Sequence, residues 1–210
     1  MDYILFERPR GIETAAIVPL GDLGLAAKNR VDYEPSPWRA LTRVLLPREV
    51  MRDDVFIDFG CGKGRVLIQA AMYPFRKVIG VELSADLCAI AEDNIERSLQ
   101  RLRCKNVEVI NTDVLEYEFP DDVTVVYFYN PFEGEIFAAA LDKLVASVRR
   151  RPRELKIIYT NPVEEELLLR AGAQLVRAMG GMRPTKKWSK QNSTRLYVLP
   201  SHARPAKDRG

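Results

Sequence analysis

The segment VFIDFGCGKGR, residues 55–65, carries three glycines between an apolar run that predicts a strand and a run that predicts a helix. A glycine turn at such a junction lets the backbone approach a ligand closely, and it leaves the N–H groups at the start of the helix free to bind one. This segment therefore predicts an α/β domain with a ligand site at the carboxyl end of its first strand.

Strand-like and helix-like runs alternate along the chain on both sides of the glycine segment. Short runs rich in β-branched residues and tyrosine predict strands over residues 54–59, 77–83, 107–110, 123–129 and 155–160. Apolar residues at helical spacing predict helices over residues 36–46, 64–72, 84–103, 132–148 and 164–171. Ser36 and Ser84 are the expected N-caps of two of them. This alternation indicates a three-layer α/β fold with a doubly wound, mostly parallel sheet.

The last two strand-like runs, residues 173–179 and 193–200, depart from that alternation. The loop between them is polar and basic and has no helical pattern, so a helical crossover is not expected there. We expect the two runs to pair antiparallel at the edge of the sheet.

The length of 210 residues and the 47% apolar content allow one substantial core. We expect a domain over residues 36–200, an N-terminal extension over residues 1–35 and a disordered basic tail over residues 201–210. The extension is semi-apolar and irregular. It fits a cover over the ligand and extra packing equally well, and both interpretations stay open.

Several classes of protein are disfavoured by what the chain lacks. Its three cysteines have no metal-like spacing and its one histidine, His202, lies in the tail, so we expect no disulfide framework, no metal site and no Cys-His or Ser-His hydrolase. No apolar run approaches the roughly 18 residues that span a bilayer, and the N-terminus does not resemble a signal peptide. We expect a soluble, cytoplasmic protein that does not bind membranes.

The net charge of +3 is unevenly distributed. Residues 1–148 carry 17 basic and 24 acidic side chains, whereas residues 149–210 carry 15 and 5. The basic third is either a solvated surface or a surface that attracts an anionic substrate such as a nucleic acid.

The spacing of the glycines distinguishes two kinds of ligand. A dinucleotide site usually has the pattern GxGxxG, with the start of the helix against a pyrophosphate. Here Gly60, Gly62 and Gly64 form GxGxG, and Asp58 precedes them by two residues. A carboxylate at that position would repel a pyrophosphate but suits a ligand with an ammonium group, so we favour a cofactor that contains an amino acid.

The segment from Asp58 to Gly64 resembles the first motif, D-x-G-x-G-x-G, of the class I, Rossmann-like S-adenosylmethionine-dependent methyltransferases. The resemblance covers about residues 32–200, and the strings FGCGKGR and YNPF are similar to those of small bacterial members. It implies an enzyme that uses S-adenosylmethionine and releases S-adenosylhomocysteine, on a sheet that ends in an antiparallel pair.

The resemblance also implies roles for residues that follow the predicted strands. Glu82 matches the acidic residue that holds both ribose hydroxyls, and Asp113 matches the one that approaches the adenine amino group, although Asp113 also fits a residue that only caps a turn. The other expected cofactor-binding positions are Phe59, Gly60, Cys61, Gly62, Gly64, Leu83, Val114 and Asn130. Cys61 is interpreted as a small residue that fits between the glycines, not as a nucleophile.

The stretch VDYEPSPW, residues 31–38, is similar to segments of several protein-lysine methyltransferases, including the non-SET histone enzymes. This similarity implies that Tyr33 and Ser36 close over the methionine end of the cofactor, with the Ser36 hydroxyl at its carboxylate. The alternative is that Ser36 only caps the following helix.

The string YNPF, residues 129–132, resembles the Asn/Asp-Pro-Pro-Tyr/Phe motif of amino methyltransferases, with one proline in place of two. The resemblance implies that Asn130 orients the target nitrogen and that Glu133 is a supporting base. The alternatives are a strand that ends in a turn at Asn130 and a helix-start charge at Glu133. Asn161 and Pro162 follow the fifth strand and are a candidate wall of the substrate pocket.

We therefore predict an S-adenosylmethionine-dependent methyltransferase that acts on nitrogen, in a protein lysine or a small amine. An RNA-directed enzyme drawn by the basic third is the first alternative. A metal-dependent O-methyltransferase is disfavoured because no carboxylate cluster accompanies the fourth strand. A nucleotide-binding module without catalysis is the alternative from another class.

Overall fold

The computed structural model describes residues 7–180 and 193–201. The loop between the last two strands, residues 181–192, and all of the predicted tail except Ser201 lie outside the described residues. Seven of the fifteen basic side chains of the C-terminal third are among those positions. Within the described part of the chain, no helix combines the length and the apolarity needed to cross a membrane.

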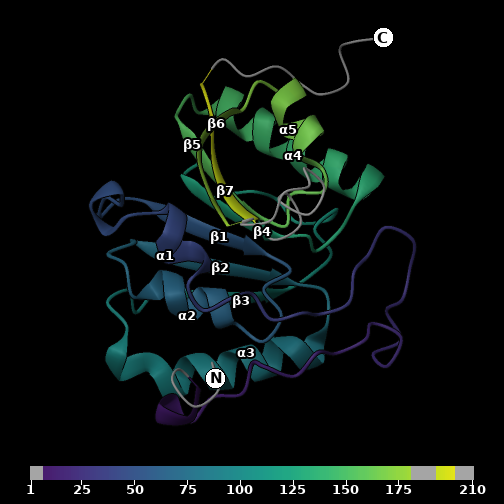
Figure 1. Cartoon of the computed structure of the whole chain (residues 1–210), viewed down its shortest axis with the longest axis vertical. Coiled ribbons are helices and arrows are strands. Elements are labelled where there is room, and N and C mark those ends of the chain that lie inside the picture. The colour runs from purple at the N-terminus through teal and green to yellow at the C-terminus, as the bar shows by residue number, and fades with distance from the viewer. Residues whose placement is uncertain (1–6, 181–192, 202–210) are drawn as a thin grey trace.

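A seven-stranded sheet forms the centre of the molecule (Figure 1). Its strands are β1 (Val55–Phe59), β2 (Lys77–Glu82), β3 (Val107–Asn111), β4 (Val125–Tyr129), β5 (Leu155–Thr160), β6 (Gln174–Gly180) and β7 (Ser193–Leu199), in the order β3-β2-β1-β4-β5-β7-β6. The first five strands are parallel, whereas β7 is antiparallel to both β5 and β6. The predicted mostly parallel sheet with a terminal antiparallel pair is confirmed.

Helices cover both faces of the sheet (Figure 1). The α-helices are α1 (Ala40–Val44), α2 (Arg65–Ala71), α3 (Ala85–Ser98), α4 (Gly134–Arg150) and α5 (Glu165–Arg170), and the short 3-10 helices are η2 (Arg8–Arg10), η3 (Pro47–Glu49) and η4 (Leu99–Arg101). Two hydrophobic clusters fill the layers, one beneath α4 and α5 and one beneath α1, α2 and α3. The predicted three layers are therefore present.

Strand β1 shows how the sequence assigns residues to the two layers. Its five residues are all buried. Because successive side chains point to opposite faces, Ile57 and Phe59 join the cluster under α4, while Phe56 joins the cluster under α2. Asp58 is two residues after Phe56, so its side chain points to the same face of the sheet. It is the polar residue near the carboxyl end of the strand on that face.

The two predicted serine caps have different outcomes. The Ser84 hydroxyl accepts a hydrogen bond from the Leu87 N–H (3.2 Å) and caps α3, as predicted. The Ser36 cap is wrong, because α1 begins only at Ala40 and has no side-chain cap. The Ser36 carbonyl and hydroxyl are instead used in tertiary hydrogen bonds to Arg65 and Tyr127, which keeps this residue out of the helix.

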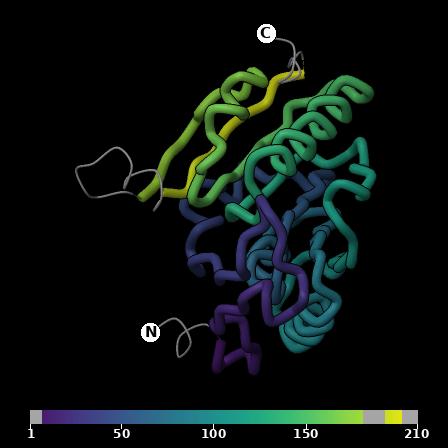
Figure 2. Tube along the Cα trace, turned by 90° about the vertical axis from the view of Figure 1, so that its right-hand side faces the viewer, coloured from purple at the N-terminus to yellow at the C-terminus, as the bar shows by residue number. Residues whose placement is uncertain are grey.

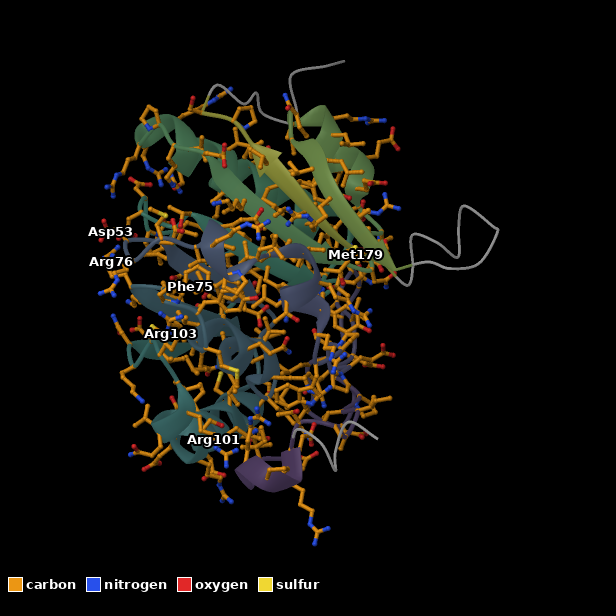
Figure 3. All side chains as sticks on the ribbon, turned by 60° about the vertical axis from the view of Figure 1, so that its left-hand side comes forward. Asp53, Phe75, Arg76, Arg101, Arg103 and Met179 are labelled. Carbon is orange, nitrogen blue, oxygen red and sulfur yellow. The ribbon has the colours of Figure 1, made fainter. Side chains whose placement is uncertain are left out.

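The N-terminal extension runs alongside α3 and then passes the carboxyl ends of the central strands (Figure 2). The Asn94 side chain exchanges hydrogen bonds with the Glu13 backbone and fixes the extension to α3 (3.1 and 3.0 Å). At the sheet edge formed by β6, Leu175, Val176 and Met179 are exposed. Met179 is labelled in Figure 3.

Candidate active site

A cavity lies at the carboxyl ends of β1 to β4, where the glycine turn predicts it. From the core of the fold it is lined by Asp58, Gly60, Cys61, Arg65, Val66, Val81, Glu82, Leu83, Leu87, Thr112, Asp113, Val114, Tyr129, Pro131, Phe132 and Ile136. The extension supplies Leu20, Arg30, Val31, Asp32, Tyr33 and Glu34, followed by Ser36. Residues that are far apart in the sequence thus meet around one space.

The glycine turn has a backbone that only glycine fits well. Gly60 and Gly62 have φ angles of +71° and +51°. A Cβ on Gly60 would lie 2.5 Å from the Pro131 side chain, and one on Gly62 would lie 2.2 Å from the Tyr33 ring. The turn is therefore packed against the segment that follows β4 and against the extension, with no room for larger residues.

Glu82 connects the glycine turn to the end of β2. Its carboxylate accepts hydrogen bonds from the Gly62 N–H (2.9 Å) and the Ser84 N–H (3.0 Å). The side chain is buried, and burial raises its pKa above the ordinary value. Each carboxylate oxygen has a second lone pair, so Glu82 can still accept hydrogen bonds from a ligand in the cavity.

Asp58 is buried at the end of β1 and lines the cavity. Burial, followed by the nearby charge of Glu82, raises its pKa well above the ordinary value. Among the described residues no cation pairs with it. A cationic group in the cavity would lower the cost of keeping this carboxylate charged.

Arg65, the first residue of α2, binds the N-terminal extension. Its guanidinium donates hydrogen bonds to the Thr14 hydroxyl (2.7 Å), to the Ser36 carbonyl (2.8 Å) and to the fully buried carboxylate of Glu7. It also stacks 5.1 Å from the centre of the Trp38 ring. This network was not predicted from the sequence, because no local pattern relates Glu7 and Thr14 to an arginine some 50 residues later.

Tyr33 lies between the extension and the glycine turn. Its ring is against Gly62, its hydroxyl donates to the Thr14 carbonyl (2.8 Å), and the Lys63 ammonium lies 5.7 Å from the ring centre. The described part of the extension shows features of both interpretations. Tyr33 lines the cavity, whereas Glu7 is fully buried and pairs with Arg65.

Asp113 follows β3 and lines the cavity, but its carboxylate already has two partners. One oxygen accepts from the Leu115 N–H (3.0 Å), which is the turn-capping role considered from the sequence. The other pairs with Arg30 of the extension. Arg30 was not among the predicted site residues, because its segment has no regular pattern.

Asn130 and Glu133 are not among the residues that line the cavity, although Tyr129, Pro131 and Phe132 are. Asn130 has a φ of +42° and is buried; its amide nitrogen donates to Glu133 (3.0 Å), and its amide oxygen accepts from the Tyr159 hydroxyl (3.5 Å).

Of the other predicted site residues, some line the cavity and some do not. Leu83 and Val114 line the cavity, whereas Gly62 and Gly64 shape its wall without lining it. Phe59 faces the other layer, where it packs against Phe128 and Phe119. Asn161 and Pro162 are also outside the cavity lining.

Cys61 lines the cavity as a protonated thiol. Burial, followed by the charges of Glu82 and Asp58, raises its pKa well above the ordinary value, which disfavours the nucleophilic thiolate. Within residues 7–180 and 193–201, no group of three or more His, Cys, Asp or Glu side chains could hold a metal ion.

A doubly wound sheet with a terminal antiparallel pair, a glycine turn after β1 and an acidic residue at the end of β2 together define the class I methyltransferase fold. The model of the family "Methyltransferase domain" matches residues 56–153. This match and the relatives described below support the prediction of a class I S-adenosylmethionine-dependent methyltransferase.

Three similar proteins illustrate the range of acceptors among its relatives. A protein-lysine N-methyltransferase of Saccharolobus islandicus is 29% identical over 136 residues, which are 64% of this chain and 83% of that protein. A probable ribosomal RNA small subunit methyltransferase A of Methanopyrus kandleri is 32% identical over 84 residues, which are 40% of this chain and 28% of that one. The solved structure of an RNA methyltransferase from Salinibacter ruber, in complex with S-adenosylhomocysteine, has a TM-score of 0.52 and 19% identity, and the match covers 79% of this chain and 94% of that one.

Proposed function

We propose that the cavity binds S-adenosylmethionine and that the enzyme methylates the nitrogen of a protein lysine or a small amine. The cavity fits the cofactor in three respects. The Gly60 backbone lines the cavity without a side chain, the buried Asp58 carboxylate suits an ammonium group, and Glu82 can accept hydrogen bonds from ribose hydroxyls.

The remaining cofactor contacts follow from the same arrangement. Ser36 and Tyr33 would hold the methionine end, while Leu83, Asp113 and Val114 would surround the adenine. Cys61 would contact the cofactor from between the two glycines, and Phe59 is buried directly before the turn. On this proposal residues 1–35 form a cover that is part of the cofactor site, and residues 36–200 form the catalytic domain.

The bound cofactor supplies an activated methyl group on a sulfonium, and the protein's task is to align an acceptor with it. In this proposal Asn130 orients the target nitrogen through its amide oxygen, and Glu133 holds the Asn130 amide nitrogen at 3.0 Å. That hydrogen bond fixes which end of the amide is available, because Glu133 can only accept from the nitrogen.

The charge around the acceptor motif is the observation that supports an amine acceptor. Glu34 is exposed and interacts with Tyr129, whose pKa is raised by burial and then by this carboxylate. Glu133 adds a second carboxylate beside Asn130. Of the five carboxylates that line the cavity, Asp58, Glu82 and Asp113 are assigned to the cofactor, which leaves Asp32 and Glu34. Such a surface attracts a cationic amine and repels a phosphate backbone.

RNA is the second candidate acceptor, on the evidence of the basic C-terminal third and of the similarity to the Methanopyrus protein. In the described residues, four arginines of this third pair with carboxylates: Arg150 with Asp121, Arg170 with Glu166, Arg177 with Glu49 and Arg195 with Glu165. These pairs favour the solvated-surface interpretation. If RNA is bound, its affinity should fall steeply with salt, with a log–log slope of several units.

Transfer of labelled methyl groups into a cell extract tests the proposal. Cofactor with a labelled methyl group is incubated with extract and enzyme, and the product is divided between protease and ribonuclease digestion. We expect protease-sensitive or low-molecular-weight label that co-elutes with methylated lysine or amines, and less of it with the Glu82→Ala variant at the same cofactor concentration. Label released only by ribonuclease would replace the amine proposal by the RNA alternative. Absence of any label from an enzyme that binds the cofactor would contradict both.

A further inference from the structure

Tyr127, in the middle of β4, is the centre of a chain of buried hydroxyl groups. Its side chain is fully buried, and its hydroxyl donates a hydrogen bond to the Ser36 hydroxyl oxygen (3.2 Å). The same hydroxyl contacts the Thr160 hydroxyl (2.8 Å), which contacts the Thr194 hydroxyl in turn (3.0 Å). This series of hydroxyl groups connects β7, β5 and β4 to Ser36, which lines the cavity.

The direction of these hydrogen bonds follows from counting protons, because each hydroxyl has one proton to donate. Tyr127 uses its proton for Ser36, so it must accept the hydrogen bond from Thr160. Thr160 has then used its own proton, and it must accept from Thr194. Burial raises the pKa of the Tyr127 hydroxyl well above its ordinary value, so the donor role persists at neutral pH.

These hydrogen bonds leave the Ser36 hydroxyl as a donor. Its hydroxyl oxygen accepts from Tyr127, which leaves its own proton for another group, and Ser36 lines the cavity. Its backbone carbonyl is held by the Arg65 guanidinium at 2.8 Å, so the residue cannot turn away easily. Ser36 thus presents a donor beside a cation at one point of the cavity, which is the chemistry that a carboxylate requires.

An ammonium group requires a carboxylate instead, and the neighbouring strand β1 supplies one in Asp58. Asp58 and Tyr127 are register partners on β1 and β4, and Asp58 contributes to the raised pKa of Tyr127. The Asp58 carboxylate and the Tyr127 hydroxyl that orients Ser36 therefore lie on one face of two adjacent strands. Together Asp58 and Ser36 match the ammonium and the carboxylate of an amino acid.

We propose that Tyr127 is a positioning residue for the cofactor: it orients the Ser36 hydroxyl so that the hydroxyl donates to the carboxylate of the amino-acid moiety. This rests on the proposed binding of S-adenosylmethionine in the cavity. Tyr127 itself does not line the cavity, so it acts through Ser36.

Two ligands that differ only in the carboxylate provide the test. S-adenosylhomocysteine has it, and its decarboxylated analogue keeps the ammonium group but lacks the carboxylate. By calorimetry, Tyr127→Phe should weaken the binding of S-adenosylhomocysteine about 10-fold, as expected for one hydrogen bond to a charged group, and should leave binding of the analogue unchanged. Ser36→Ala should show the same discrimination, and the double variant should lose no more than either single variant.

Tyr73→Phe is the matched control, because it removes another buried tyrosine hydroxyl, which donates to the Leu45 carbonyl (2.9 Å) away from the cavity lining. It should not distinguish the two ligands. Equal weakening of both ligands by Tyr127→Phe, or no weakening of either, would overturn the proposal. If Tyr127→Phe does not fold, a Ser36→Ala variant that binds S-adenosylhomocysteine like the wild type overturns it instead. A wild-type protein that binds neither ligand contradicts the proposed function itself.

Discussion

Replacement of Gly62 by alanine tests whether the extension is packed on the glycine turn. The new Cβ would lie 2.2 Å from two carbons of the Tyr33 ring, where ordinary contacts begin at 3.4 Å. The ring would have to move by about 1 Å, and overpacking of this kind costs about 1–3 kcal/mol. Alanine at the positive φ of +51° adds about 1–2 kcal/mol. The expected loss of stability is therefore about 2–5 kcal/mol.

Gly24→Ala is the matched control, because Gly24 has a φ of +68° and a Cβ added there would meet no atom within 4 Å. It should cost only the backbone contribution of about 1–2 kcal/mol. Urea denaturation of the full chain measures both values. The ring that moves also lines the cavity, so Gly62→Ala should weaken cofactor binding and Gly24→Ala should not. Equal destabilisation by the two variants would refute the packing of Tyr33 on this turn.

Three further predictions concern the cofactor, the chemical step and the response to acid. S-adenosylmethionine and S-adenosylhomocysteine should raise the melting temperature while NAD should not, and Glu82→Ala should weaken their binding by about 1–3 kcal/mol; equal stabilisation by NAD would contradict the cofactor assignment. Asn130→Ala should leave cofactor affinity nearly intact and lower the single-turnover rate by about 10²-fold or more, whereas a folded variant with the wild-type rate would remove Asn130 from the chemistry. Arg177 lowers the pKa of Glu49 from 4.5 to about 2, so this pair stabilises the fold above about pH 4.5 and its contribution is lost as the pH falls towards 2. The stability difference between the wild type and Glu49→Gln should shrink over that range, and a difference independent of pH would show that the charge is not its cause.

The sheet and its helices could be predicted because local patterns determine them. Strand β1 is a run of buried residues that are apolar except for Asp58, and α3 combines a serine cap with apolar residues at every fourth position. The resemblance to the methyltransferase motifs selected Asp58, Glu82 and Asp113, and the three residues meet at one cavity because parallel strands end at the same edge of a sheet. For these positions the order along the chain is enough to predict their neighbourhood.

Predictions that depended on contacts outside the local pattern were incomplete. Ser36 fits a helix cap by sequence, yet its carbonyl and hydroxyl are used by Arg65 and Tyr127, so the helix starts four residues later. Asn130 follows a strand as predicted, but whether it reaches a substrate stays a prediction, because its side chain is held by Glu133 and Tyr159.

The sequence by itself determined the glycine turn, the class of fold and the acidic strand ends, because each depends on residues within one or two turns of the chain or on the pleat of a strand. Only the tertiary structure decided how the extension is attached: Glu7 to Arg65, Arg30 to Asp113 and Tyr33 to Gly62. These contacts join residues 29 to 83 positions apart. Their partners are selected by burial and by hydrogen-bond satisfaction in the folded protein, and no local periodicity records such a choice.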